Sequence, residues 1–306
     1  MKKIVVGVDA GGSKTAAVVG DGHTILSRAD GPGGAIRPGR ALLAATAIAD
    51  TVRQALSAAG QLQADVLVVG AAGAGRAAER EELERALRSE QIAQRVMVTT
   101  DIEVALAAAF GRGPGIVVSA GTGSIAIGRT QDGVSHRSGG YGWQMGDEGS
   151  GYAIGRAGLS ALSRAADGRG PKTALTPRII AAARAADLDG LISWAVNATA
   201  SEVSSLAPTV LEVAAENDVV AQGIVDYAAR ELCQLARSLL PFYPAGETVQ
   251  VALAGGILTP NRPLRDLVRQ RLGEESRFNL INFTIEPALG ALHLAEKMSE
   301  PPSNVP

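Results

Sequence analysis

The chain has little cysteine: Cys233 is the single one among 306 residues. One thiol excludes an intrachain disulfide and a metal site built from several thiolates, and this pattern is typical of proteins from a reducing compartment. Because cysteine is often buried, we expect Cys233 to be a small core residue. The three histidines, His23, His136 and His293, are too scattered to have metal-ligand spacing.

Aromatic residues and net charge are also scarce, at 3% of the chain and a formal −2 at pH 7. Few aromatic rings leave few platforms for base stacking, and this charge creates no basic field, so we expect no nucleic-acid partner. Charges or glycines interrupt the apolar runs before they reach membrane-spanning length. Because Met1 leads into an alternating apolar strand without a signal-peptide pattern, we expect a cytoplasmic protein with no membrane partner.

The first abundant feature is glycine, and a glycine-rich loop lies in residues 7–15, GVDAGGSKT. Its glycines have the spacing of a P-loop, but Ser13 stands where that motif requires lysine. The apolar segment after the loop reads as a strand, and Asp21-Gly22 then favours a two-residue hairpin turn. We therefore expect the loop to join two strands. Such a hairpin suits phosphate, because its backbone N–H groups approach the oxygens closely and hydroxyls add donors.

The same plan recurs in residues 116–133, IVVSAGTGSIAIGRTQDG. Both copies have an apolar strand, a glycine loop containing Gly-Ser, a second apolar strand and an Asp-Gly turn. Ser13 precedes Asp21 by the same 8 positions that separate Ser124 from Asp132. Two such hairpins predict two half-molecules of similar topology.

The expected fold class is therefore α/β, with one domain over residues 1–110 and a second over residues 111–306. Glycines and a proline at 111–115 mark the hinge between them. In the first domain, apolar spacing predicts helices near 45–56 and 78–89 and strands at 64–70 and 95–100. In the second, it predicts a helical block near 152–241 and a strand at 248–256. Whether the last helix returns to the first domain stays open.

Several stretches in this order carry a resemblance to known proteins. Residues 9–15 (DAGGSKT), 120–124 (AGTGS) and 254–257 (AGGI) resemble the two phosphate loops and the adenosine loop of the actin, sugar kinase and Hsp70 ATPase superfamily. TTD ending at Asp101, GGYGWQMGDEGSG at 139–151 and EPALGA at 286–291 resemble the N-acetylglucosamine kinase-like branch of the BadF/BadG/BcrA/BcrD ATPase family. The resemblance spans nearly the whole chain. It implies two actin-like, ribonuclease H-like lobes with a nucleotide cleft between them.

The resemblance also implies ATP and Mg²⁺ as cofactors and assigns roles to residues that match the motifs. Asp9 would hold Mg²⁺ through waters, because this cation binds few carboxylates and keeps much of its hydration shell. Asp101 would be the general base for the sugar hydroxyl, kept ionised near a helix N-terminus. The nucleotide-binding residues would be Gly11, Gly12, Ser13, Lys14, Thr15, Gly121, Thr122, Gly123, Gly255 and Gly256. The sugar-binding residues would be Ser124, Gly140, Tyr141, Gly142 and Asp147.

These residues also have purely structural interpretations. Asp101 suits a helix N-cap, since aspartate is favoured there. Asp147 and Glu148 suit a solvated turn, and Gly255-Gly256 suits the end of an ordinary strand. The matching order of the motifs favours the functional interpretation.

Two positions depart from the family pattern. Family members usually place an asparagine for the sugar soon after a Gly-Pro-Gly, whereas here residues 31–33 are followed by Gly34 and Ala35. Some amino-sugar kinases also have asparagine after the second loop, where this chain has Ile125. Because unmatched polar groups are costly to bury, such losses change substrate selectivity. The identity of the sugar is therefore open.

The sequence thus predicts an ATP-dependent sugar kinase, a phosphotransferase with an alcohol group as acceptor. The expected substrate is N-acetylglucosamine or glucosamine, phosphorylated at the 6-hydroxyl. The alternatives are a glucose or broad hexose kinase, an ATP-driven activator of a radical enzyme, a sugar-responsive regulator, and a filament or chaperone ATPase. A single cysteine disfavours the activator, which shares an iron–sulfur cluster between subunits. The expected partner is a small sugar, and a homodimer stays open.

Overall fold

The computed structural model describes residues 3–260 and 262–300, which form two compact units. Unit 1 contains the described residues up to Gly113 and those from Ile285 onward, and unit 2 contains those between Pro114 and Thr284. The boundary between Gly113 and Pro114 lies in the predicted hinge. The last helix packs in unit 1, so the question that the sequence left open is answered in favour of a return.

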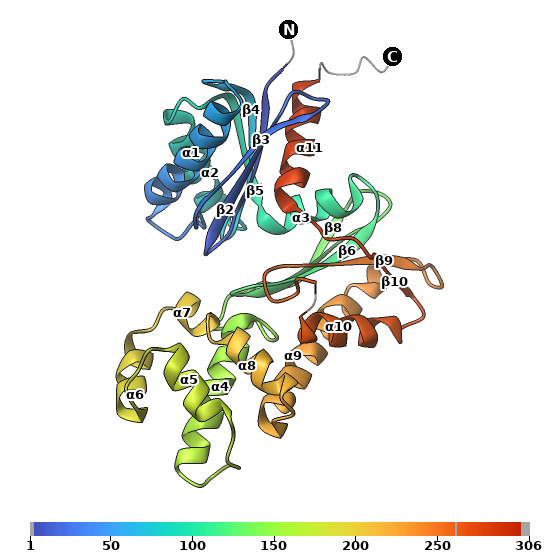
Figure 1. Ribbon diagram of the computed structural model, residues 1–306. Coiled ribbons are helices and arrows are strands. Elements are labelled where there is room, and N and C mark those ends of the chain that lie inside the picture. The colour runs from blue at the N-terminus through green and yellow to red at the C-terminus, as the bar shows by residue number, and fades with distance from the viewer. Residues whose placement is uncertain (1–2, 261, 301–306) are drawn as a thin grey trace. The chain divides into compact units, whose positions relative to one another are not determined.

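Unit 1 is built on a five-stranded sheet in the order β3-β2-β1-β4-β5 (Figure 1). Its strands are β1 (Val5–Ala10), β2 (Lys14–Gly20), β3 (Ile25–Pro32), β4 (Ala64–Ala71) and β5 (Ala93–Thr100). The first three form an antiparallel meander, and β4 and β5 run parallel to β1. The first glycine loop therefore joins two strands, as predicted.

The turn between β2 and β3 differs from the predicted two-residue hairpin. Gly20 pairs with Ile25, so the turn contains the four residues from Asp21 to Thr24. The Asp21 carboxylate accepts hydrogen bonds from the backbone N–H groups of His23 (3.0 Å) and Thr24 (2.9 Å). Because an aspartate side chain can replace a backbone acceptor in this way, it stabilises a longer turn than Asp-Gly alone indicates.

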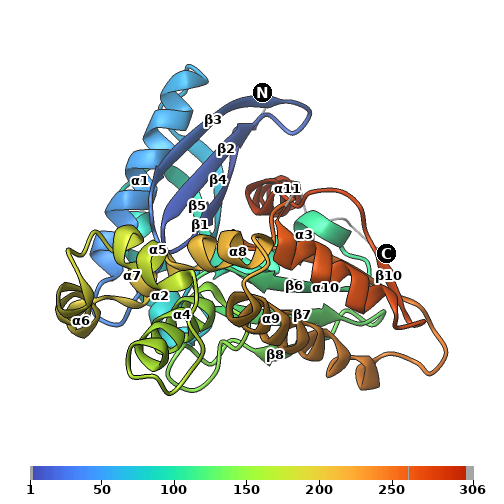
Figure 2. The ribbon, with the colours of Figure 1, turned by 60° about the horizontal axis from the view of Figure 1, so that its bottom comes forward.

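Helices cover both faces of this sheet (Figures 1 and 2). They are α1 (Ala41–Ala58) and α2 (Ala77–Ser89) on one face, and α3 (Asp101–Phe110) and α11 (Pro287–Ser299) on the other. Glycines allow the second pair to approach closely. A Cβ on Gly7 of β1 would overlap the backbone of α11 at Leu292, and one on Gly290 of α11 would overlap the backbone of α3 at Val104.

Unit 2 repeats the strand arrangement of unit 1, with the sheet order β10-β9-β6-β7-β8. Its strands are β6 (Gly115–Ala120), β7 (Ser124–Arg129), β8 (Ser135–Gly139), β9 (Val249–Ala254) and β10 (Phe278–Leu280). Here too an antiparallel meander, β6 to β8, is followed by two strands parallel to the first. The two half-molecules of similar topology predicted from the repeated hairpins are confirmed.

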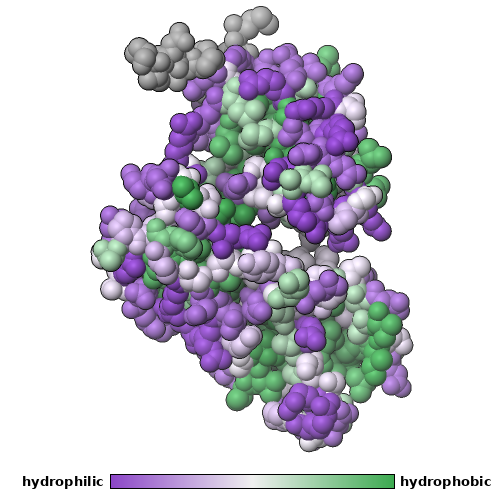
Figure 3. All heavy atoms as spheres, turned by 180° about the vertical axis from the view of Figure 1, so that it is seen from behind, coloured by the Kyte–Doolittle hydropathy of each residue, from purple (hydrophilic) through white to green (hydrophobic). Residues whose placement is uncertain are grey.

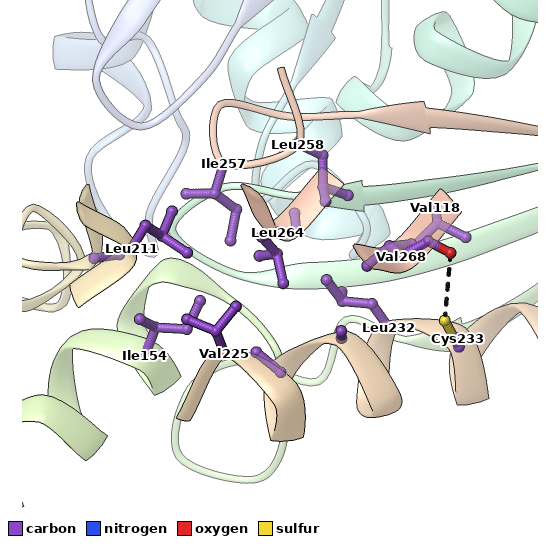
Figure 4. Packing of buried hydrophobic residues seen from close by; sticks show 14 of the residues in the cluster. Val118, Ile154, Leu211, Val225, Leu232, Cys233, Ile257, Leu258, Leu264 and Val268 are labelled. Atoms are coloured by element: carbon purple, nitrogen blue, oxygen red, sulfur yellow. Dashed lines mark hydrogen bonds between the residues drawn. The ribbon is translucent and has the colours of Figure 1, made fainter. Parts of the chain in front are cut away.

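A helical block packs on the sheet of unit 2. It contains α4 (Gly151–Ala166), α5 (Leu175–Ala182), α6 (Leu188–Asn197), α7 (Ala200–Ser204), α8 (Ala207–Ala215), α9 (Val219–Arg237) and the short 3₁₀ helix η1 (Leu240–Phe242), and α10 (Pro263–Gly273) follows β9. In the core of unit 2, α9 faces α10 (Figure 4). Cys233 is fully buried there, as predicted, and its thiol lies 3.8 Å from the Val268 carbonyl oxygen. Burial raises the pKa of this thiol to about 11.

Hydrophilic residues form most of the surface seen in Figure 3, with smaller hydrophobic groups between them. Some large hydrophobic side chains are nonetheless exposed, among them Leu42 and Leu43 in the first turn of α1. Within residues 3–260 and 262–300, no helix is both long and apolar enough to cross a membrane.

Asp218 links the start of α9 to the segment before α5. As the N-cap of α9, its carboxylate accepts a hydrogen bond from the N–H of Ala221 (2.9 Å). It also accepts one from the N–H of Ala174 (2.8 Å) and one from the hydroxyl of Thr173 (2.9 Å). Partial burial raises the pKa of Asp218, but these hydrogen bonds outweigh burial and hold it below its usual value.

We expect Asp218→Ala to lower the free energy of unfolding by about 1–2 kcal/mol at pH 7, because a cap and a link between segments are lost together. A depressed folded-state pKa stabilises the protein above the unfolded-state pKa, so the difference from wild type should shrink as the pH falls below about 4. Urea denaturation at several pH values measures this difference in the free energy of unfolding. Asp187→Ala, which removes a cap that bonds the N–H of Gly190 only, is the matched control. The prediction would be contradicted if Asp218→Ala lowers the free energy of unfolding by no more than Asp187→Ala does.

Candidate functional site

Two of the predicted functional carboxylates lie at the same end of the sheet in unit 1. Asp9 is next to last in β1, on the sheet face that α11 covers. It is in register with Gly70 of β4, which is in register with Thr99 of β5. Asp101 follows β5 directly as the first residue of α3. The parallel strands β1, β4 and β5 therefore bring the two carboxylates to one edge of the sheet.

Burial and like charge determine the titration of Asp9. Burial raises its pKa, the charge of Asp101 raises it further and Lys14 opposes both, with a net rise to about 7. Two carboxylates in a poorly solvated site repel each other, and a nearby cation relieves that repulsion. The site therefore favours additional positive charge beside Asp9.

Asp101 differs in two respects from the sequence-based expectations. Thr100, not Asp101, is the N-cap of α3, so the structural interpretation of Asp101 as a cap is wrong. Burial raises the pKa of Asp101 and the charge of Glu103 adds to this, although the Ile102 N–H donates a hydrogen bond to its carboxylate (3.0 Å) and opposes the rise. A carboxylate with a raised pKa is a better proton acceptor than an ordinary aspartate.

The first hairpin exposes some of its predicted phosphate-binding residues and buries another. Gly12, Ser13 and Lys14 are exposed at its tip. Thr15 is fully buried, and its hydroxyl donates a hydrogen bond to the Pro32 carbonyl oxygen (2.7 Å). The exposed tip therefore offers backbone N–H groups, a hydroxyl and an ammonium group, while Thr15 joins the hairpin to the end of β3.

A cavity of about 460 Å³ opens beside Asp9 within unit 1. Two ion pairs line it: Lys14 Nζ lies 3.0 Å from Asp30 Oδ1, and Arg28 Nη1 lies 2.7 Å from Glu286 Oε2. Among the described residues, no group of three or more histidine, cysteine, aspartate or glutamate side chains could hold a metal ion. Mg²⁺ does not need such a group, since one or two carboxylates and substrate phosphates suffice. The half-buried carboxylate of Asp9, whose pKa is raised by burial and by the charge of Asp101, fits this cation.

In unit 2, the second hairpin is fixed to the start of α4. The N–H of Gly151 donates to the carbonyl of Gly121 (2.8 Å), and the N–H of Tyr152 donates to that of Thr122 (3.2 Å). Ser124 is only 3% exposed, and its hydroxyl donates to the carbonyl of Glu148 (2.7 Å). Hydrogen bonds thus join the hairpin to the predicted sugar-binding segment and to the start of α4.

Strand pairing changes the correspondence between the two hairpins. Thr15 pairs with Ala10 at the end of β1, and Ser124 pairs with Ala120 at the end of β6. Ser124 is therefore equivalent to Thr15 and not to Ser13, although the equal offsets to the Asp-Gly turns indicated the latter. The reason is that the second loop has one residue fewer between its paired strand ends.

Asp147 holds the predicted sugar segment against the second hairpin. It is 8% exposed and adopts a φ of 63°, which non-glycine residues rarely adopt. Burial raises its pKa, while the backbone N–H groups of Ser124 and Gly142 donate to the carboxylate and lower it, with a net rise. A Cβ on Gly123 would lie 2.7 Å from an Asp147 oxygen, so glycine is needed for this approach. Tyr141, in contrast, is 61% exposed.

The predicted adenosine loop lies beside the second hairpin. Gly255 has a φ of 92°, and a Cβ there would overlap the Ala120 carbonyl group, so this position requires glycine. The N–H of Ile257 donates to that same carbonyl (3.2 Å). Gly256 is exposed, with nothing within 4 Å of where its Cβ would be. A flat group can therefore approach the backbone at Gly256.

The loop that lacks the family asparagine is tied to the first hairpin. The N–H of Ala35 donates to the carbonyl of Gly11 (3.1 Å), and the N–H of Ile36 donates to that of Ala72 (2.9 Å). Ala35 is half-buried and Ile36 is buried. The wall beside this hairpin is therefore apolar at positions 35 and 36.

Two features of the site were missed in the sequence. The first is Glu103, which forms a capping box with Thr100; the Thr-x-x-Glu pattern was the available signal. The second is a cavity of about 830 Å³ between α4 and α9, lined on one side by Trp143 and Tyr152, whose ring centroids lie 5.0 Å apart. Nothing in the spacing of these residues predicts that cavity.

Comparison with known proteins agrees with this arrangement. The model of the BadF/BadG/BcrA/BcrD ATPase family matches residues 6–295. An N-acetylmuramic acid/N-acetylglucosamine kinase of Clostridium acetobutylicum is 31% identical over 301 residues, which are 96% of this chain and 98% of the relative. An N-acetyl-D-glucosamine kinase of Dictyostelium discoideum is 29% identical over 312 residues, with the same coverage.

Two solved structures have the same fold as this chain. A protein of Chromobacterium violaceum assigned as an N-acetylglucosamine kinase is 29% identical, with a TM-score of 0.81 over 96% of this chain and 99% of its own. A hexokinase of the ROK family from Thermus thermophilus is 19% identical, with a TM-score of 0.57 over 97% of this chain and 100% of its own, and shares the fold. The chain belongs to the BadF/BadG/BcrA/BcrD ATPase family.

Proposed function

We propose that this protein is an ATP-dependent kinase that transfers a phosphoryl group to the 6-hydroxyl of an amino sugar, with N-acetylglucosamine as the first candidate. The observation that carries the proposal is the pair of half-buried carboxylates with raised pKa values, Asp9 and Asp101, at one edge of the sheet in unit 1. The sugar class is supported by two relatives that match 96% of the chain, an N-acetylmuramic acid/N-acetylglucosamine kinase and an N-acetyl-D-glucosamine kinase.

The two carboxylates have different environments and suit different roles. Asp101 would accept the proton of the sugar hydroxyl, because burial raises its pKa while the Ile102 N–H holds its orientation. Asp9 would hold Mg²⁺, which neutralises phosphate charge in this class of reaction. Lys14, exposed beside Asp9, would contact the phosphates.

Unit 2 would supply the remaining binding groups. The hairpin at Gly121–Gly123 offers backbone N–H groups to phosphate, and the exposed Gly256 lets a nucleotide lie against the backbone. The segment from Gly140 to Asp147 would bind the sugar, with Tyr141 exposed for contact. Ser124 would support this segment through its bond to Glu148.

An ATP-driven activator of a radical enzyme is less well supported. Such activators need cysteine thiolates for a cluster shared between subunits. Cys233 is fully buried in the core of unit 2 and its pKa is raised to about 11, so it offers no accessible thiolate.

The direct test is a phosphorylation screen with purified protein, ATP and Mg²⁺. We expect ADP release with N-acetylglucosamine, and slower or comparable release with glucosamine, N-acetylmuramic acid and glucose. The 6-deoxy analogue of N-acetylglucosamine is the matched control, since it lacks the acceptor hydroxyl and should give only background ADP. Mass spectrometry and phosphorus NMR identify the product. ADP release that no sugar stimulates would overturn the proposal.

Asp101→Asn tests the general base. The amide keeps an oxygen that accepts the Ile102 N–H, so the first turn of α3 should persist. We expect kcat to fall by about 10²–10⁴-fold, because the sugar hydroxyl loses its proton acceptor. Calorimetry should show that sugar and nucleotide bind with little change. A kcat near that of the wild type would remove Asp101 from this role.

Asp9→Asn tests the magnesium site. We expect the Mg²⁺ concentration needed for half-maximal rate to rise by at least about 10-fold at fixed ATP, because a neutral amide attracts the cation less. The matched control is Asp50→Asn, which removes a carboxylate from an exposed ion pair with Arg53 in α1. It should leave the Mg²⁺ dependence unchanged. If Asp9→Asn and Asp50→Asn show the same Mg²⁺ dependence of the rate, Asp9 does not hold the magnesium ion.

A further inference from the structure

Strand β5 passes into helix α3 without a loop, so the direction of the Asp101 side chain depends on one junction. β5 ends at Thr100 and α3 begins at Asp101. Thr100 is extended, with φ −82° and ψ 153°, and the next residue is helical. A small rotation at this junction would move the Asp101 carboxylate, since nothing else lies between the strand and the helix.

Glu103 bonds both sides of this junction. One of its carboxylate oxygens accepts from the N–H of Thr100 (3.2 Å) and from the Thr100 hydroxyl (3.1 Å), and it also accepts from the hydroxyl of Thr99. In return, the Thr100 hydroxyl oxygen accepts from the N–H of Glu103 (3.2 Å). The last two residues of the strand are thus tied to the first turn of the helix.

We propose that Glu103 is a positioning residue that fixes the first turn of α3 so that Asp101 points at the sugar hydroxyl. This inference rests on the proposed function, because it takes Asp101 as the base. Glu103 is exposed, and its carboxylate is committed to the threonines, so it does not itself act on the substrate. Thr99 also donates its hydroxyl to Glu103. Because Thr99 is in register with Gly70, and Gly70 with Asp9, this bond links the start of α3 to the strands that carry Asp9.

A capping box also stabilises a helix without any role in chemistry. Loss of stability alone would therefore not separate a positioning role of Glu103 from a purely structural one. The chain offers a matched control in unit 2, where Thr199 and Glu202 form the same box at the start of α7. The Thr199 N–H lies 2.7 Å from a Glu202 oxygen, and both glutamates are exposed. Glu202 belongs to none of the proposed binding or catalytic groups.

The experiment compares Glu103→Ala, Glu103→Gln and Glu202→Ala by steady-state kinetics and thermal denaturation. We expect Glu103→Ala to lower kcat by about 10- to 100-fold, the scale of a misplaced catalytic group, with KM values for sugar and ATP within about twofold of wild type. Glu103→Gln keeps a side-chain acceptor and should recover most of the lost kcat. Glu202→Ala should lower the melting temperature by a similar amount and leave kcat unchanged.

A double variant shows whether Glu103 acts through Asp101. If it does, adding Glu103→Ala to Asp101→Asn should lower kcat by less than about twofold further, because the group being positioned is already gone. The inference would be overturned if the kcat losses of Glu103→Ala and Asp101→Asn multiply in the double variant. It would also be overturned by equal kcat losses in Glu103→Ala and Glu202→Ala, or by no recovery of kcat in Glu103→Gln.

The outcomes also separate this inference from the proposed function. The role of Glu103 alone would be overturned if the wild type phosphorylates sugar and Asp101→Asn is inactive, but Glu103→Ala keeps full kcat. A wild type whose ADP release no sugar stimulates would overturn both, since Asp101 would then have no hydroxyl to deprotonate.

Discussion

Loss of hydration at two neighbouring acidic side chains, with like charge added to it, is the constraint on which the chemistry of unit 1 depends. Asp9 and Asp101 each lose hydration; the charge of Asp101 further raises the pKa of Asp9, and the charge of Glu103 further raises the pKa of Asp101. The chain offsets this cost only in part, with Lys14 beside Asp9 and the Ile102 N–H on Asp101. A site left short of positive charge favours a cation, and a magnesium-bound nucleotide supplies one. The same imbalance would therefore suit the two proposed roles, Asp9 as a metal carboxylate and Asp101 as a base with a raised pKa.

Close packing on glycine creates that environment. Side chains larger than hydrogen at Gly7 of β1 and Gly70 of β4 would overlap α11 and α3, and one at Gly290 would keep these two helices apart. With glycine at these positions, both helices lie directly on the sheet beside the carboxylates. One of them, α11, comes from the far end of the sequence. The electrostatics of Asp9 thus depend on contacts between segments that are distant along the chain.

This dependence explains which features the sequence predicted. The two hairpins, their strands and the repeated topology follow from local patterns of glycine and apolar residues, and the structure has them. The four-residue turn at Asp21 depends on side-chain hydrogen bonds that spacing does not reveal. The start of α3 at Asp101 depends on the Thr100–Glu103 capping box, for which the Thr-x-x-Glu pattern was a signal. The upward direction of the Asp101 pKa was missed for a different reason. A helix N-terminus alone favours the ionised form, but burial outweighs it, and burial depends on how the unit packs.

The equivalence of Thr15 and Ser124 indicates how the two hairpins divide their work. Each residue pairs with the alanine that ends the preceding strand, is buried, and donates its hydroxyl to a carbonyl of a following segment, Pro32 or Glu148. Because these hydroxyls already have partners, they serve to fix the loops. In the proposed function, contacts to phosphate would fall to backbone N–H groups and to the exposed tip. Backbone groups in a glycine loop recognise the shape and charge of phosphate and are indifferent to the sugar. Selectivity for the proposed sugar would then arise elsewhere, and the apolar wall at Ala35 beside the first hairpin is a candidate.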